Sequence, residues 1–482
     1  MRFRIPENLN IDEVIEKNKE IFYRRNLKRY KLIFIIDAVI NSRAEHRNEL
    51  NEQETKFAPL SSLILQEVVH DYRNYFDFLL EAEILLTDNH FIVGEKCKGY
   101  CFNDQYNGQR LKEERVESHT LKRAKRRALE KRNMEIKKSM WGYSYLTKWW
   151  DSDKLKIDLN CADSWLEVYE KENIESIKNS SKRKKNERIK RAIDTTEDLK
   201  QLARNINYQQ ARYSFSGEGH RFYNPISNIK RELRNFLTYD GQPLVEIDLK
   251  NSQPFLATKL FDISFWEHSK NSKNIGLKNI DREIYEKVIN DKRYNDIITL
   301  LKTSESLCSK GSDFEKYNDL VVNGIFYEYV QRLFEPLFPD RFNNRSNVKK
   351  EVLRIFYVEN EETGRPFYYP CKIFRYHFPL VHELFSLIKE IQSNYLPILL
   401  QRIESFLILD IVCKRISSLY PQIPLFTIHD SILTTKGNEA IVEEITAREI
   451  QNWMGHQASF GKKYLLPLSA NELVNIDEKE LP

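Results

Sequence analysis

LVEIDLKNSQP, residues 244–254, is a short β-branched strand that ends in Asp248 and runs directly into a polar segment. A related pattern, LFTIHDSIL at residues 425–433, places Asp430 among strand-forming residues, and its last residues are typical of the return strand of a hairpin. A lone carboxylate within a strand is costly to bury unless a cation or hydrogen-bond donors compensate it. Two such aspartates therefore predict a metal site or a basic partner.

The same two carboxylates suit one particular chemistry. In two-metal phosphoryl transfer, carboxylates on adjacent strands hold two Mg²⁺ ions about 3.5–4 Å apart. One ion activates the attacking oxygen and the other stabilises the leaving oxygen. Asp248 and Asp430 are therefore the candidate catalytic and metal-ligating residues, unless each is simply an aspartate at a strand end or turn.

A basic helix is expected between the two strands. Arg345, Lys349 and Phe356 follow one another at steps of four and seven, which places them on one helix face. A guanidinium and an ammonium group on that face could grip the β and γ phosphates of a nucleotide. An aromatic side chain one or two turns further on could stack on the nascent base pair, or could instead face the core.

These segments resemble, in order and spacing, the motifs of the family A, DNA-polymerase-I-like, enzymes. Residues 245–253 resemble motif A, and residues 428–432 resemble motif C. The spacing of motif B, shared with phage-type single-subunit RNA polymerases, is matched by Arg345, Lys349 and Tyr357. The run Asn251–Gln253 is similar to that of the transposon and virus branch of this superfamily.

The resemblance implies an α+β, helix-rich fold: a right-hand polymerase with a small antiparallel palm sheet, helical fingers and thumb, and a helical N-terminal region. It implies metal ligation by Asp248, Asp430 and the backbone carbonyl of Leu249, with two Mg²⁺ ions that Mn²⁺ could replace. The implied nucleotide-binding residues are Arg345, Lys349, Tyr357 and Gln253. The implied primer-template residues are Arg221, Gln401, Glu404 and His429.

The chain also departs from the family pattern. Motif A usually carries a glutamate where this chain has Gln253, and motif C usually continues with a glutamate where it has Ser431. Val358 follows Tyr357 in place of a glycine. The sugar preference therefore does not follow from the sequence.

Charge is unevenly distributed along the chain. The 76 Lys and Arg residues against 71 Asp and Glu give a net charge of only +5, yet nine positions between Leu121 and Lys138 are basic. A second block, residues 182–191, holds seven basic residues in ten. Two such blocks indicate a polyanionic partner, although a basic helix can also be merely solvated.

Composition and periodicity indicate several helical regions. With 14 glycines and 15 prolines in 482 residues, tight hairpins should be few. We expect an amphipathic helix over Leu60–Glu83, a basic helix over the first block, and a thumb-like helical hairpin over 160–205. The expected regions are a basic helical N-terminal domain (1–150), a linker and thumb-like region (151–204), first palm part (205–262), fingers (263–375), and second palm part with the C-terminal segment (376–482).

Several features point to a cytoplasmic protein that does not engage a membrane. No apolar run approaches 18 residues, the first residues lack a signal-peptide core, and six scattered cysteines do not suggest a disulfide framework. No Asp-x-Glu strand pattern of a proofreading exonuclease accompanies Asp37, Asp71 or Asp158.

The sequence favours a template-directed nucleic-acid polymerase, specifically a DNA polymerase that acts by two-metal-ion nucleotidyl transfer. Its partners would be a nucleic-acid template and primer, nucleoside triphosphates, and proteins of replication or of a mobile element. An RNA polymerase or primase-like enzyme of the same fold is the nearest alternative. Two others are an HD-type phosphohydrolase, suggested by His70-Asp71 and His429-Asp430, and a non-catalytic nucleic-acid-binding protein derived from a polymerase.

Overall fold

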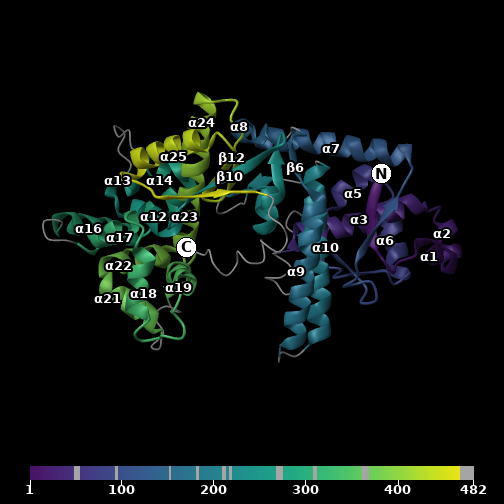
Figure 1. Ribbon diagram of the computed structural model, residues 1–482, viewed down its shortest axis with the longest axis horizontal. Helices are drawn as coiled ribbons and strands as arrows, with labels where there is room; N and C mark the ends of the chain where they lie inside the picture. The colour runs from purple at the N-terminus through teal and green to yellow at the C-terminus, as the bar shows by residue number, and fades with distance from the viewer. Residues whose placement is uncertain are drawn as a thin grey trace. The chain divides into compact units, whose positions relative to one another are not determined.

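The computed structural model describes residues 1–47, 55–92, 96–150, 153–180, 184–208, 213–215, 220–267, 275–307, 312–360 and 368–466. These residues divide into two compact units, whose elements are labelled in Figure 1. The described residues of unit 1 lie within Met1–Arg212 and Asn224–Gly241 and include Leu466, and those of unit 2 lie within Tyr213–Tyr223 and Gln242–Leu465. Because the chain passes between the units more than once, neither unit is one continuous stretch.

Unit 1 combines short strands with helices. Its described strands are β1 (Arg2–Pro6), β2 (Ala58–Pro59), β3 (Leu85–Thr87), β4 (Gly99–Phe102), β5 (Leu111–Arg115), β6 (Leu155–Ile157) and β9 (Leu237–Tyr239). Its described helices are α1 (Ile11–Lys17), α2 (Lys19–Arg24), α3 (Arg29–Glu45), α5 (Ser62–Val68), α6 (Tyr72–Glu81), α7 (His119–Ser139), η1 (Trp141–Tyr143), α8 (Ser144–Thr147), α9 (Leu159–Asn179), α10 (Lys185–Asn207), α11 (Pro225–Asn228) and η2 (Glu232–Phe236). The strands pair antiparallel as β1 with β5, β2 with β4, β4 with β3, and β6 with β9.

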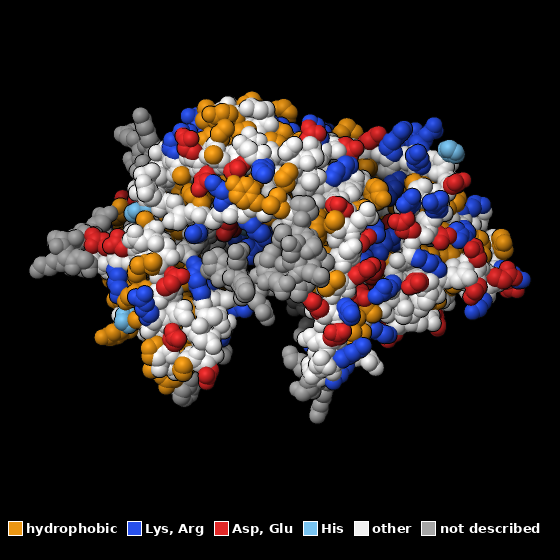
Figure 2. Space-filling model, viewed as in Figure 1, with side chains coloured by type: hydrophobic (Ala, Val, Ile, Leu, Met, Phe, Trp, Pro, Cys, Tyr) orange, Lys and Arg blue, Asp and Glu red, His pale blue; other side chains and the backbone are white. Residues whose placement is uncertain are grey.

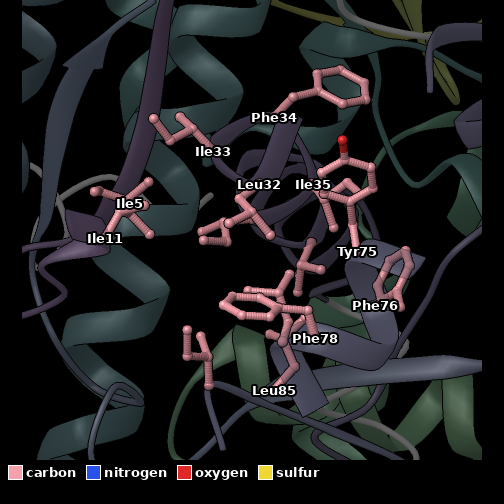
Figure 3. Packing of buried hydrophobic residues seen from close by; sticks show 14 of the residues in the cluster. Ile5, Ile11, Leu32, Ile33, Phe34, Ile35, Tyr75, Phe76, Phe78 and Leu85 are labelled. Atoms are coloured by element: carbon pink, nitrogen blue, oxygen red, sulfur yellow. The ribbon is translucent and has the colours of Figure 1, made fainter. Parts of the chain in front are cut away.

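The core of unit 1 forms around α3, a helix that is apolar on nearly every side. Its Leu32 and Ile33 are buried with Ile5 of β1 and with Tyr75 and Phe78 of α6. Figure 3 shows the side chains of α3 and α6 pointing toward one another. Each such side chain contributes about 1.5–3 kcal/mol through its removal from water.

The expected single helix over Leu60–Glu83 is wrong, because the structure has two helices there, α5 and α6. Between them Val69 adopts an extended conformation and is fully buried, and Asp71 accepts a hydrogen bond from Nζ of Lys31 at 2.8 Å. Both helices face the same core, so the apolar periodicity continues through the break and does not reveal it.

Helices α9 and α10 lie side by side as a hairpin (Figure 1). The carboxylate of Asp158 caps the start of α9 by accepting hydrogen bonds from the backbone N–H groups of Asn160 and Cys161. This confirms the helical hairpin expected over 160–205, while its role as a thumb stays a prediction. The helix expected over the first basic block is also confirmed, as α7.

The face of α10 that meets α3 is unusually rich in buried charge. Arg43 of α3 donates to Asp198 at 2.8 Å and to Asp194 at 2.7 Å, and Arg4 of β1 pairs with Glu197. Burial opposes the positive charge of Arg43, yet the two carboxylates outweigh burial and raise its pKa. Burial raises the pKa of Asp198 to about 6, although Arg43 favours its ionised form.

Unit 2 has a sheet formed by β10, β11, β12 and β13 and a separate pair of short strands, β7 and β8, among many helices. Its described strands are β7 (Ser214–Phe215), β8 (Phe222–Tyr223), β10 (Gln242–Leu249), β11 (Phe426–Ile428), β12 (Ser431–Thr435) and β13 (Phe460–Tyr464). Its described helices are α12 (Ser252–Ala257), η3 (Thr258–Phe261), α13 (Ile263–Trp266), α14 (Leu277–Ile280), α15 (Arg282–Ile289), α16 (Arg293–Leu307), α17 (Asp313–Val322), α18 (Phe326–Phe334), α19 (Arg345–Tyr357), α21 (Tyr369–His377), α22 (Pro379–Ile391), α23 (Tyr395–Ser405), η5 (Phe406–Cys413), α24 (Lys414–Leu419) and α25 (Glu439–Met454).

The unit 2 sheet is antiparallel, with the order β11-β12-β10-β13. Its register sets Asp248 of β10 opposite Ser431 of β12 and opposite Gly461 of β13. Both expected strands are therefore present and adjacent, and the end of β10 lies beside the hairpin that joins β11 to β12.

A long helix leads toward this hairpin. It begins at Tyr395, before Gln401, and runs through α23, a π-helical segment (η5) and α24 to Leu419. Glu404 is buried within it, and the following apolar residues are nearly all buried too. The segment is thus a helix of the core.

The helix-rich α+β class with small antiparallel sheets is confirmed, and unit 1 contains strands as well as the expected helices. The assignment of palm, fingers and thumb stays a prediction. Among the described residues, no helix is both long enough and apolar enough to cross a membrane.

We predict that Arg43→Met destabilises unit 1 by about 3–5 kcal/mol, because it leaves Asp194 and Asp198 buried without their cation. Urea unfolding, with hydrogen exchange of α3 and α10 followed by mass spectrometry, measures the loss.

The matched control is Arg2→Met, which removes an exposed ion pair with Glu113 in the same unit and should cost at most about 1 kcal/mol. Equal effects of the two substitutions would contradict a special role for the buried cluster.

Candidate active site

The two sequence-predicted aspartates meet at a tight turn of unit 2. Ile428 pairs with Ser431, so His429 and Asp430 form a two-residue loop between β11 and β12. His429 has a φ of +52°, a left-handed conformation that residues other than glycine rarely adopt. Such a conformation is costly and is found preferentially at functional sites. The turn directs Asp430 toward the end of β10, where Asp248 lies.

The two carboxylates differ in exposure and influence each other. Asp248 is exposed, contrary to the expectation of a buried strand carboxylate, whereas Asp430 is half-buried. The hydroxyl of Ser431 donates a hydrogen bond to Oδ1 of Asp248 at 2.7 Å. Burial of its carboxyl group, followed by repulsion from Asp248, raises the pKa of Asp430 to about 6.

The polar segment after β10 surrounds Asp430. Asn251 has a φ of +53° and precedes the first turn of α12, whose first residue is Ser252. Both residues are buried. The hydroxyl of Ser252 and the charge of Lys349 favour the ionised form of Asp430, but burial and Asp248 outweigh them.

Helix α19 brings the predicted cations to this place. Arg345, in its first turn, donates to Oδ1 of Asn251 at 2.9 Å and to Oε1 of Glu328 at 2.8 Å. Its guanidinium carbon lies 5.0 Å from the ring centroid of Tyr327. Lys349, one turn later, is exposed and close enough to Asp430 to lower its pKa.

The two aromatic residues at the end of α19 differ in position. Phe356 is fully buried against Phe374 and Phe385, so of the two positions that the sequence left open it takes the one that faces the core. Tyr357 instead turns to the site, where its hydroxyl donates to Oε1 of Gln253 at 2.8 Å.

Gln253 continues a chain of hydrogen bonds into the core helix. Its Nε2 donates to Oε2 of Glu404 at 2.7 Å, and Glu404 also accepts two hydrogen bonds from Arg221, at 3.0 and 3.2 Å. Glu404 is only 2% exposed. Burial, followed by repulsion from Asp430, raises the pKa of Glu404 to about 8 against the opposing effect of Arg221. Burial also raises the pKa of Tyr357.

Three other predicted residues occupy the edges of this arrangement. His429 packs edge-on against Tyr223, with ring centroids 5.9 Å apart. Gln401 is half-buried on α23, three residues before Glu404. Leu249 ends β10 with a buried side chain, and the ligand role of its carbonyl stays a prediction.

Sequence reasoning missed Tyr327 and Glu328, which hold Arg345, and the contribution of Ser252. Tyr327 and Glu328 follow one another on α18, where nothing in the local pattern distinguishes them from other helical residues. Ser252 carried a signal, because it belongs to the polar run after β10.

The donor set suits a hard divalent cation. Asp248 and Asp430 offer carboxylate oxygens, the ligands that Mg²⁺ prefers, and such a site would keep several waters. Repulsion between the two carboxylates supplies a reason for a cation to bind. Among the residues that the structure describes, no group of three or more His, Cys, Asp or Glu side chains could hold a metal.

Comparisons with known proteins return little. No protein-family model matches the chain, and no curated protein matches it. Among solved structures, it is similar to the POL domain of Pol1 from M. smegmatis in complex with DNA primer-template and dNTP. The identity is 10%, the match covers 72% of this chain and 73% of that chain, and the TM-score is 0.29. The function must therefore be argued from the site itself.

The raised pKa values predict how the stability of unit 2 depends on pH. A raised folded-state pKa stabilises the fold at low pH, and this contribution is lost as pH rises through the folded value. For Asp430 the loss falls between about 4 and 6, and for Glu404 between about 4.5 and 8. We expect the melting temperature of unit 2 to decline from pH 5 to 8.5 in EDTA, by about 2–4 °C per kcal/mol lost.

Glu404→Gln should flatten the decline above pH 6, because the amide resembles the protonated acid at every pH. Asp296→Asn, an exposed position on α16, is the control and should leave the pH profile unchanged. A Glu404→Gln profile parallel to that of the wild type would show that Glu404 does not titrate in this range.

Proposed function

We propose that this chain is a template-directed nucleic-acid polymerase, a nucleotidyltransferase, and that it synthesises DNA. The observation that carries the proposal is the meeting of Asp248 and Asp430 with Lys349 and Tyr357 of α19 in one unit. These residues come from distant parts of the sequence, and their combination suits phosphoryl transfer better than it suits a structural role.

Asp248 and Asp430 would hold two Mg²⁺ ions, which Mn²⁺ could replace, with the Leu249 carbonyl as a further ligand. Bound there, the metal would neutralise charge on the reacting phosphate and lower the pKa of the attacking hydroxyl. The residues of the chain have separate tasks. Ser431 orients the carboxylate of Asp248 by donating a hydrogen bond to it. The turn at His429 holds Asp430 beside β10.

The cations of α19 would bind the triphosphate. Lys349 is exposed and can reach a phosphate directly. Arg345 already contacts Asn251 and Glu328, so it would exchange the glutamate for a phosphate oxygen or hold Asn251 in place. Tyr357 and Gln253, joined by a hydrogen bond, would form the wall beside the nucleotide.

Two of the four residues implied to contact the primer and template have a different proposed role. Arg221 and Glu404 form an ion pair with each other, and Glu404 accepts a hydrogen bond from Gln253, so we assign to them the positioning of Gln253. His429 and Gln401 remain the proposed contacts to the primer and to the paired bases.

The decisive assay is extension of a labelled primer on DNA and RNA templates, with Mg²⁺ or Mn²⁺ and with dNTPs or rNTPs separately. Asp248→Asn and Asp430→Asn should each lower the rate about 1000-fold or more, since several kcal/mol of metal-dependent stabilisation are lost. Asp296→Asn should extend like the wild type.

Extension with dNTPs would support the DNA polymerase, whereas extension with rNTPs alone would support the RNA polymerase or primase-like alternative. Absence of extension by wild-type protein on every template would contradict the proposal and favour a non-catalytic nucleic-acid-binding protein.

Lys349 and its neighbour Lys350 provide a matched pair, because both are exposed on α19 but only Lys349 acts on Asp430. Lys349→Ala should raise KM for the nucleotide about 10-fold to 100-fold, which is the value of one charged hydrogen bond. Lys350→Ala should leave KM unchanged. Steady-state extension kinetics measure both, and equal effects would remove Lys349 from the nucleotide site.

A further inference from the structure

A second surface, on unit 1, has the chemistry of a nucleic-acid site. Helix α7 and the short η1 helix after it carry a stripe of residues at steps of four, four, three, four and three, the spacing of one helix face. We call it the α7 stripe; its members are Arg123, Arg127, Lys131, Met134, Lys138 and Trp141. Because α7 has 21 residues, the stripe is about 30 Å long.

The other side of α7 is the one that packs on unit 1. Leu121 is buried, and the ammonium of Lys125 lies 5.1 Å from the ring centroid of Phe3 on β1. Lys131, at the edge of the stripe, reaches Glu67 of α5. The α7 stripe therefore points away from the core, and Figure 2 shows Lys and Arg side chains gathered over part of α7.

Two apolar side chains in the α7 stripe are strongly exposed. Trp141 is 83% exposed and Met134 is 60% exposed. A tryptophan seldom remains in water when the fold could cover it, and an exposed indole among cations is a common feature of binding surfaces. The indole follows the basic helix directly, separated from Lys138 by two residues.

The cations of the stripe are little neutralised within the chain. Arg123, Arg127 and Lys138 form no ion pair with any residue that the structure describes, and Lys131 pairs with Glu67 while remaining more than half exposed. The α7 stripe thus combines positive charge with an exposed aromatic ring.

We propose that the α7 stripe binds single-stranded nucleic acid, with its cations on the phosphates and a base stacked on Trp141. Single strands are bound by such a pairing of charge with aromatic platforms, whereas a duplex keeps its base faces covered. This proposal does not rest on the proposed active site, because every residue of the stripe belongs to unit 1.

The test uses the full chain carrying Asp248→Asn and Asp430→Asn, in EDTA, so that binding is measured without extension. Fluorescence anisotropy of a labelled oligo-dT of about 20 nucleotides, which is long enough to span the stripe, gives the affinity and its salt dependence. The variants are the triple Arg123→Glu, Arg127→Glu, Lys138→Glu, and the single substitutions Trp141→Ala and Trp141→Phe. A control triple of exposed unit 2 cations, Lys292→Glu, Lys414→Glu and Lys436→Glu, changes the net charge equally.

The stripe triple should weaken binding and reduce the slope of log affinity against log salt by about 2, since each lost phosphate contact contributes about 0.7 for a single strand. Trp141→Ala should weaken binding about 10-fold to 100-fold without changing the slope of log affinity against log salt. Trp141→Phe should keep most of the wild-type affinity, because a phenyl ring can still stack on a base. Hydrogen exchange of the wild-type complex should show protection at residues 119–143. Circular dichroism checks that α7 persists in each variant.

Three results would overturn the proposal. The first is an equal loss in the control triple, which would mean that only net charge matters. The second is an unchanged affinity in Trp141→Ala, together with equally tight binding of a blunt duplex, which would indicate a duplex site instead. The third is protection from hydrogen exchange that is confined to unit 2 when the oligonucleotide binds.

Discussion

Repulsion between the carboxylates of Asp248 and Asp430 is the constraint around which the polar part of unit 2 is arranged. The antiparallel register of β10 and β12 forces the two groups together, and the half-buried one responds with a raised pKa. Ser431 donates to one carboxylate, while Ser252 and Lys349 favour charge on the other. These neighbours reduce the repulsion without removing it, so the site retains an affinity for positive charge.

The buried carboxylates of α10 in unit 1, by contrast, are paired with a cation inside the chain. Asp194 and Asp198 lie close together on α10, but Arg43 binds both and completes their hydrogen bonding inside the chain. Asp248 and Asp430, by contrast, form no ion pair within the described part of the chain. A carboxylate whose charge is compensated inside the chain is not available to a ligand, whereas one left uncompensated at a surface is. The contrast between the two units is a physical reason for placing the chemistry in unit 2.

Much of the site could be predicted from the sequence, because strands and their terminal aspartates leave a local signal. The strand before Asp248 and the hairpin at Asp430 are present as expected. Contacts between residues far apart in the sequence left no such signal. The burial of Glu404 and its ion pair with Arg221, for example, depend on how α23 packs. The same limit explains the break at Val69, where a continuous apolar pattern spans two helices.

Gln253 and Ser431, the two positions where the sequence differs from the motifs that it resembles, both make hydrogen bonds to carboxylates of unit 2. Gln253 donates to the carboxylate of Glu404, so a carboxylate from another helix lies beside position 253. Ser431 donates to Asp248. A glutamate at position 431 would add a third negative charge next to two that already repel. A hydrogen-bond donor at this position instead lowers the cost of holding Asp248 and Asp430 together, while their remaining oxygens stay available to a cation.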